Sequence, residues 1–402
     1  MKKRTILIII FLLTGGLVLW GINKGETKQM TYTKSKNTDV LSMMLQNEDG
    51  SYEETTRSEW PTEEYTLNTS LSFCENGGTI SWDDDKKIVV MDSDASDKCY
   101  VYFDLSNSKN FAEYIKSLYT GVQGENNLYL HDSLLANGAN DGSYRFAGSS
   151  ETTNNFVCFG YDSTDGSCPT DNLYRIIGVF GDNVKLIKYD YATSDLLGVD
   201  GDYSNRSLLS SNYDTYKGNV NEVSLYYWNS ATADSWADSS LNSINLNIDF
   251  LRNIGTTWAN KMLMSTWKVG GNTWDDIAKQ SVATTYKNEL LLPSVSTTVS
   301  KKVGLMYISD YGYAAAPRAW NTFLNDYHYV ISINWMYMGL PEWTITPLKD
   351  NSKNEFAIRE SGLVGNAGSN STALPLSLCF YLNSDIIYKS GNGTMSTPYI
   401  IE

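Results

Sequence analysis

The segment LPEWTITP, residues Leu340–Pro347, places a carboxylate, an indole and two hydroxyls between two prolines. A second run, FAIRESGLVGN at Phe356–Asn366, follows closely. Such residues suit a catalytic site, a ligand-binding surface or the scaffold of a β-rich domain. Aromatic and β-branched residues at alternating positions are what a sheet core requires. We therefore interpret Trp343 as a core residue and Glu342 as a structural hydrogen-bond acceptor.

The composition is that of a globular protein of two or three domains. The chain has 402 residues, of which 42% are hydrophobic and 19% charged. Its net charge of -15 argues against binding nucleic acid, which needs a basic surface to neutralise phosphates. Tyrosine dominates the aromatic residues, with 28 Tyr against 12 Phe and 11 Trp. Tyrosine-rich loops suit an extracellular binding module, and a tyrosine-rich all-β core would give the same composition.

The N-terminus predicts a membrane anchor. The uncharged apolar run at residues 5–22 approaches the ~20 residues of a spanning helix. The basic residues Lys2, Lys3 and Arg4 place the tip, residues 1–4, in the cytoplasm and the C-terminal domains outside the cell. We expect a single-pass signal anchor followed by a polar stalk at residues 23–44. A cleavable signal peptide is the alternative, although no A-x-A-like cleavage site follows the run.

Five cysteines outside a membrane invite pairing. Cys74 and Cys99 flank an expected hairpin, and Cys158 and Cys168 flank a short loop, so we predict these two disulfides. Cys379 lies in the apolar run LSLCFYL and is expected to be buried. Five reduced, buried thiols are the alternative. The chain contains no C-x-x-C motif, so a zinc knuckle is not supported.

The pattern beyond the stalk predicts two domains. Short strands separated by turn residues at residues 45–104 indicate a small all-β domain. Residues 105–402 mix helical and strand patterns without βαβ alternation, which favours an α+β fold. Two β-rich runs across Gly181-Asp182-Asn183 predict a hairpin, and KVGLMYISDYGYA at residues 302–314 predicts a strand that runs into an aromatic loop.

Residues for catalysis or metal binding are scarce. The chain has only two histidines, His131 and His328, and no G-x-S-x-G motif. The acid-rich loops, including Asp200-Gly201-Asp202, lack the pattern of a twelve-residue calcium loop and are read as turns. We expect no metal and no cofactor. A carboxylate-based hydrolase would have to draw on acids such as Glu289, Glu342 and Glu355.

An aromatic group is the remaining candidate site. Tyr311 and Tyr313 lie in DYGYA, and Trp335 and Tyr337 lie in NWMYMG, beside asparagine, aspartate and glycine. Such rings suit stacking on a sugar or gripping a peptide, and they equally suit a core. These four residues are our candidate ligand-binding residues.

The order of EWTITP, AIRESG and LCFYL resembles the closing segments of formylglycine-generating-enzyme-like domains. That family is built on the C-type-lectin-like fold and uses a pair of active-site cysteines, whereas this region has only Cys379. The resemblance therefore implies a catalytically inactive scaffold, in which Glu342, Trp343 and Arg359 match by position, with a ligand surface in the long loops. The E-P-N or Q-P-D run of calcium-dependent sugar-binding lectins is absent.

Most of residues 45–402 also resembles predicted membrane-anchored surface proteins of Gram-positive gut bacteria. We therefore expect a membrane-anchored extracellular binding or adhesion protein for a glycan, cell-wall or protein ligand. The alternatives are an extracellular enzyme, either a carboxylate-based hydrolase or a diverged oxidase-like domain, and a structural cell-envelope protein.

Overall fold

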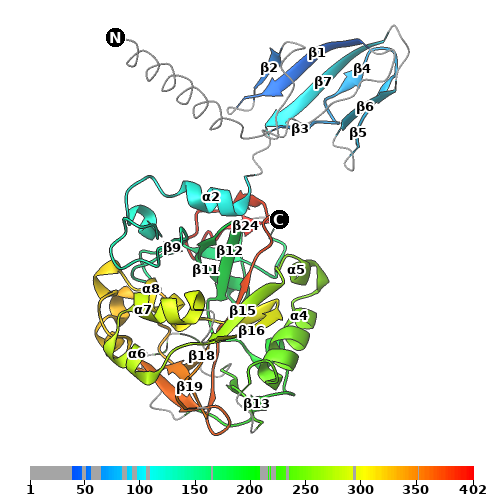
Figure 1. The fold of residues 1–402 in the computed structure, drawn as a ribbon. Coiled ribbons are helices and arrows are strands. Elements are labelled where there is room, and N and C mark those ends of the chain that lie inside the picture. Colours follow the sequence, from blue (N-terminus) through cyan, green and yellow to red (C-terminus); the bar gives the residue numbers. More distant parts are fainter. Residues whose placement is uncertain are drawn as a thin grey trace, which may run out of the picture. The chain divides into compact units, whose positions relative to one another are not determined.

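A computed structural model describes residues 39–47, 51–55, 65–83, 88–92, 97–105, 109–163, 166–208, 216, 218, 223–231, 235–292, 296–351 and 353–402. The chain divides into two compact units, residues 1–108 (unit 1) and 109–402 (unit 2). The fold is mixed α+β with several sheets and is mostly β (Figure 1). In the described part of the chain, no helix is long and apolar enough to cross a membrane. The expected anchor, residues 5–22, lies outside the described residues.

Unit 1 is built on a five-stranded sheet in the order β2-β1-β7-β3, with β4 also paired to β7. A separate hairpin joins β5 to β6. The small buried core of unit 1 consists of Met43, Cys99, Val101 and Phe103. The strands are β1 Asp39–Gln46, β2 Tyr52–Thr55, β3 Tyr65–Leu67, β4 Phe73–Cys74, β5 Thr79–Asp83, β6 Ile88–Asp92 and β7 Lys98–Leu105.

The position of β1 corrects the predicted stalk. We expected residues 23–44 to form a polar connector, but β1 begins at Asp39 and pairs in parallel with β7. Met43 is only 2% exposed, because every second residue of this strand faces the core. Residues 39–44 therefore belong to the folded unit, and residues 23–38 lie outside the described residues.

Unit 2 is organised around a seven-stranded sheet in the order β17-β22-β12-β11-β9-β8, with β10 also paired to β11. The hairpin of β11 and β12 is confirmed: Phe180 pairs with Asn183 across Gly181-Asp182. Gly181 takes a φ of 62°, which glycine tolerates without strain. Both strands are almost wholly buried, as expected for central strands covered on both faces.

The strands of unit 2 are β8 Leu128–Leu130, β9 Tyr144–Phe146, β10 Phe156–Cys158, β11 Leu173–Phe180, β12 Asn183–Lys188, β13 Tyr203–Ser204, β14 Leu225–Tyr227, β15 Ser265–Gly270, β16 Ser296–Lys301, β17 Val303–Leu305, β18 Glu342–Pro347, β19 Asn354–Ile358, β20 Val364–Gly368, β21 Ala373–Leu374, β22 Leu378–Tyr381, β23 Tyr388–Ser390 and β24 Ile400–Ile401. Its α-helices are α2 Phe111–Ser117, α3 Ser194–Leu197, α4 Phe250–Asn253, α5 Thr256–Asn260, α6 Trp274–Lys279, α7 Val282–Tyr286 and α8 Ile308–Ala314. Two π-helical segments lie at Leu241–Asp249 and Lys287–Leu291.

The two ends of unit 2 lie side by side (Figure 1). The backbone N–H of Phe111 donates to Ile386 O at 2.7 Å, and Tyr388 N donates to Lys109 O at 2.9 Å. Asn110 caps α2 by accepting from two backbone N–H groups of its first turn, which fixes the start of the helix. Between β12 and β22 the chain makes a long excursion. β22 then pairs with β12 in the same sheet.

Helix α8 corrects the expected aromatic loop. The segment after β17 is a helix, Ile308–Ala314, in which every residue is buried. Its N-terminus is capped by a residue that is distant in the sequence. The Glu289 carboxylate accepts from Ile308 N and Ser309 N, each at 3.1 Å. A carboxylate at a helix N-terminus satisfies the N–H groups that have no partner within the helix.

Both predicted disulfides are confirmed. Cys74 bonds to Cys99 across the β4–β7 pair, and Cys158 bonds to Cys168. Cys379 is a free, buried cysteine on β22, also as expected, and burial raises the pKa of its thiol.

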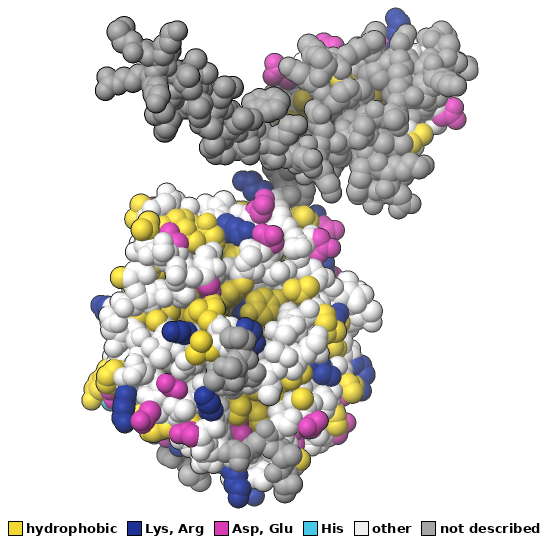
Figure 2. Space-filling model, in the orientation of Figure 1, with side chains coloured by type: hydrophobic (Ala, Val, Ile, Leu, Met, Phe, Trp, Pro, Cys, Tyr) yellow, Lys and Arg dark blue, Asp and Glu magenta, His cyan; other side chains and the backbone are white. Residues whose placement is uncertain are grey.

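The charged side chains of unit 2 lie mostly on its surface. Figure 2 shows acidic and basic side chains interspersed over the visible face, with no broad basic area there. Exposed pairs such as Lys279–Asp275, 2.9 Å apart, contribute little to stability because water screens them.

Candidate functional site

Three of the four candidate ligand-binding residues are buried, so for these three the core role applies and not the binding role. Tyr311, Tyr313 and Trp335 are 0%, 1% and 1% exposed. Tyr311 OH donates to Gly362 O at 2.7 Å, and Trp335 Nε1 donates to Phe146 O at 2.8 Å. Their polar atoms are thus used inside the protein, and their ring faces pack in the core.

Tyr337 is the candidate that reaches a pocket. It is half-buried, and its hydroxyl donates to Glu360 O at 2.6 Å. With Tyr189 it lines a cavity of about 340 Å³, which we call the aromatic pocket. Its lining residues are Ser149, Ser150, Glu151, Tyr189, Ile331, Ser332, Asn334, Tyr337 and Met338.

A buried arginine lies next to this pocket. Arg175 lines a narrow gap that shares Tyr189 and Met338 with the lining of the aromatic pocket. Arg175 is 1% exposed, and its Nη1 donates to the hydroxyl of Ser150, a pocket residue, at 2.8 Å. Burial lowers the pKa of Arg175 to about 9. The acceptors that the structure shows for its guanidinium are all neutral: Asn155 Oδ1, Ser150 Oγ and the carbonyl oxygens of Thr153 and Trp335.

A second, larger cavity of about 620 Å³ lies beyond the end of β12, and we call it the polar pocket. Lys188 is 5% exposed there, and its Nζ donates to Asp171 O at 3.1 Å. Burial outweighs the nearby Asp190 and Asp171 and lowers the pKa of Lys188. The lining residues are Asp171, Asn172, Lys188, Asp190, Tyr191, Thr193, Ser194, Asp195, Leu196, Tyr203, Tyr216, Val223, Ser224 and Asn253.

The end of β12 separates the two pockets. Lys188 and Asp190 line the polar pocket, and Tyr189 between them lines the aromatic pocket. Side chains of an extended segment alternate between two sides, so three consecutive residues serve both cavities. Our prediction from sequence missed these residues. The available signal was a polar run, Lys188-Tyr189-Asp190, at the end of a buried strand.

Of the residues carried over from the family resemblance, Glu342 and Trp343 lie on β18, and Arg359 directly follows β19. Trp343 is fully buried, and its Nε1 donates to Tyr226 O at 2.8 Å. Glu342 is 2% exposed, so both residues lie in the interior of unit 2. Arg359 is 39% exposed, and its Nε lies 3.8 Å from Glu360 Oε2. These positions suit a structural role for Glu342 and Trp343.

Glu342 is a buried acid with an altered pKa. Burial raises the pKa of its carboxyl to about 8, and hydrogen bonds from Ser377 only partly oppose this shift. Its Oε2 atom has no hydrogen-bond partner among the described residues. The neutral form of the carboxyl is therefore favoured in the fold at neutral pH.

Replacing Glu342 with glutamine is expected to remove a pH-dependent loss of stability. The wild-type fold holds a proton that the unfolded chain releases above about pH 4.5, so unfolding becomes easier as the pH rises towards about 8. The slope is at most about 1.4 kcal/mol per pH unit. Melting temperatures measured from pH 5 to pH 9 should show Glu342→Gln gaining on the wild type up to about pH 8. Parallel curves for the two proteins would contradict this assignment, and Glu360→Gln, at a half-exposed acid, is the control.

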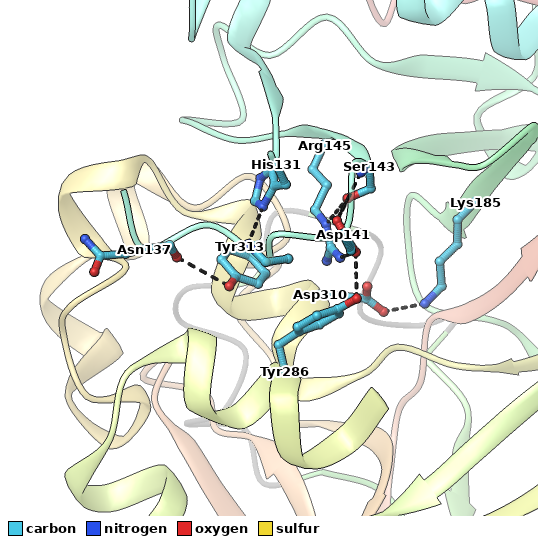
Figure 3. A network of polar contacts seen from close by, with 10 residues as sticks. His131, Asn137, Asp141, Ser143, Arg145, Lys185, Tyr286, Asp310 and Tyr313 are labelled. Atoms are coloured by element: carbon cyan, nitrogen blue, oxygen red, sulfur yellow. Dashed lines mark hydrogen bonds and ion pairs between the residues drawn. The ribbon is translucent and has the colours of Figure 1, made fainter. Parts of the chain in front are cut away.

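A network of buried charges joins β9, β12, α7 and α8 (Figure 3). Lys185 Nζ lies 2.5 Å from Asp310 Oδ2, with side chains 0% and 2% exposed. Arg145 Nη2 lies 2.6 Å from Asp141 Oδ2, which also accepts from Tyr286 OH at 2.7 Å. Buried charges of this kind must be paired to be tolerated, so the network joins these elements structurally.

His131 is held neutral beside this network. Its Nδ1 accepts from Ala139 N at 3.0 Å. Figure 3 shows the imidazole next to Tyr313. Burial and the Arg145 charge lower the pKa of His131 well below its ordinary value. Its Nε2 has no hydrogen-bond partner among the described residues, and the imidazole packs against Tyr313 and Trp320. Its hydrogen bond with Ala139 N therefore stabilises the loop that follows His131.

Among the described residues, the grouping of side chains that could hold a metal ion by distance is Cys74, Asp97 and Cys99. The two cysteines form a disulfide, so neither offers a thiolate, and Asp97 accepts from Asn76 N and Gly78 N. This grouping is part of the scaffold of unit 1.

No protein-family model matches the chain, and neither a curated protein nor a solved structure matches it.

Proposed function

We propose that the protein is a membrane-anchored extracellular binding protein that recognises a glycan through the two pockets at the end of β12. The observation that carries this proposal is the pairing of an aromatic pocket with a larger polar one across a single residue, Tyr189. Together they offer tyrosine rings for the apolar faces of sugars and several carboxylates, amides and hydroxyls for sugar hydroxyls.

The proposed membrane anchor and extracellular location rest mainly on the sequence. The apolar run at residues 5–22 supports the anchor, and the two disulfides fit an oxidising compartment. We also propose a C-type-lectin-like organisation for unit 2. It is supported by the paired ends of the unit and by the long excursion between the adjacent strands β12 and β22, from which both pockets are largely built.

The test is a binding assay with the full-length protein on a glycan array and on isolated bacterial cell wall. Tyr337→Ala in the aromatic pocket and Asp190→Asn in the polar pocket should each weaken binding about tenfold, which corresponds to about 1.4 kcal/mol. Tyr329→Ala is the matched control, because Tyr329 is 77% exposed and lies outside both linings.

Absence of saturable binding to either material, or binding that all three variants retain equally, would overturn the proposal. Release of sugar fragments during incubation would instead favour the hydrolase alternative, in which the acids of the polar pocket act on the glycan.

A further inference from the structure

A buried carboxylate with one unpaired oxygen lies at the end of the π-helical segment Leu241–Asp249. Asp249 is 1% exposed, and its Oδ1 accepts from Arg252 Nη2 at 2.6 Å. Its Oδ2 accepts from no N–H or hydroxyl group among the described residues, and the group that it meets is the Asp200 carboxyl, with which it can share a hydrogen bond only if one of the two acids is protonated. A buried carboxylate oxygen without a donor is costly, so this position calls for a proton or a cation.

A second carboxylate faces the same point. A Cβ atom added to Gly198 would lie 2.5 Å from Asp249 Oδ2 and 2.9 Å from Asp200 Oδ1. The two carboxylate oxygens therefore converge over the Cα of Gly198. Gly198 has a φ of 77°, which glycine adopts readily, and any larger residue would fill the space between the two oxygens.

The loop that carries Asp200 is held in place by the same π-helical segment. Asn245, one turn before Asp249, accepts from Asp202 N at 3.0 Å and donates to Leu197 O at 2.8 Å and Asp200 O at 3.1 Å. Asn245 is fully buried. The buried Asn245 thus fixes the backbone of the loop that brings Asp200 close to Asp249.

The charges around this point do not balance. Arg252 supplies one positive charge, but its side chain is 65% exposed and bonds the other oxygen of Asp249. Burial and the neighbouring Asp200 together raise the pKa of Asp249. On the other side of the loop, Tyr226 donates its hydroxyl to Gly198 O at 2.8 Å and carries no positive charge.

We propose that Asp200 and Asp249 bind one calcium ion between them, at a site separate from the two pockets and beyond the proposed function. Ca²⁺ is bound by carboxylate oxygens and water in irregular arrangements, which suits two carboxylates at an open loop. With so few protein ligands the affinity is that of extracellular modules, with a Kd on the order of 10⁻⁴–10⁻³ M. Bound Ca²⁺ would join the loop at Gly198–Asp202 to the π-helical segment.

Calorimetric titration of the full-length protein with CaCl₂, and its melting temperature with CaCl₂ or with EDTA, test the site. The wild type should bind Ca²⁺ saturably and melt at a higher temperature in CaCl₂. Asp249→Asn should lose both effects. Asp200→Asn should lose them as well, and because Asp200 is exposed this variant is expected to fold even if the other does not. Asp385→Asn, at an exposed acid outside the site, should keep them.

The proposal is overturned if the wild type shows no saturable Ca²⁺ binding. It is equally overturned if Asp200→Asn retains the wild-type calcium effect, because the ion then binds elsewhere. A fall of stability with rising pH that Glu342→Gln keeps, that Asp200→Asn abolishes and that is the same with CaCl₂ and with EDTA would mean that the two carboxyls share a proton, and this also excludes the calcium site. None of these results depends on whether a glycan binds.

Discussion

Replacing Lys185 with methionine is expected to lower the free energy of unfolding of unit 2 by about 3–5 kcal/mol, the usual cost of removing one partner from a buried ion pair. Burial by itself would lower the pKa of Lys185, but the Asp310 carboxylate 2.5 Å away raises it above its ordinary value. Asp310 also accepts from Tyr307 N at 2.9 Å, so the pair connects β12 to the first turn of α8. Without the ammonium group, the Asp310 carboxylate would remain buried beside α8 with its closest cation missing.

Urea denaturation followed by circular dichroism measures this effect. The matched control is Lys279→Met, since Lys279 pairs with Asp275 at 2.9 Å but both side chains are more than half exposed. That variant should differ from the wild type by no more than about 0.5 kcal/mol. Equal losses of unfolding free energy in the two variants would show that the Lys185–Asp310 pair contributes no more to stability than the exposed Lys279–Asp275 pair.

Replacing Trp343 with alanine is expected to cost about 3–5 kcal/mol, the range for removing a large aromatic side chain from a core. Trp343 is fully buried on β18, and its indole N–H donates to Tyr226 O on β14 at 2.8 Å. The loss therefore combines a cavity with an unsatisfied carbonyl. Trp343→Phe should recover much of the packing but not the hydrogen bond, so we expect an intermediate loss of about 1–3 kcal/mol.

The same denaturation experiment separates the two contributions. Tyr329→Ala, at a residue that is 77% exposed, should change stability by less than about 0.5 kcal/mol and so controls for the loss of an aromatic ring. A Trp343→Ala protein as stable as this control would contradict the core assignment of the EWTITP strand. A Trp343→Phe protein as stable as the wild type would show that the bond to Tyr226 O contributes nothing.

Features encoded by near neighbours in the chain were predictable. The β11–β12 hairpin follows from two apolar runs around Gly181-Asp182, a signal contained within a few residues. The disulfide partners followed from cysteines that flank short loops, and the burial of Cys379 from its apolar surroundings. In each case the residues that determine the structure are adjacent or nearly so.

Helix α8 shows what local sequence could not give. ISDYGYA contains a glycine and two tyrosines, which favour loops or strands over helices. The helix is stabilised by groups distant in sequence, the Glu289 cap and the Lys185–Asp310 pair. The need for glycine at position 312 is visible only in the packing, since a Cβ atom there would collide with Val282 on α7. The burial of Tyr311 and Tyr313 follows from that helix and could not be read from their spacing.

The sequence by itself determined the α+β class, the β11–β12 hairpin and the two disulfides, because each depends on composition or on residues close together in the chain. The tertiary structure decided which aromatic residues are buried, that Tyr189 and Tyr337 share one pocket, and that Asp200 and Asp249 converge over Gly198. Those features join segments separated by tens to more than a hundred residues. Their geometry is fixed by packing and charge pairing across the whole unit, which no local pattern encodes.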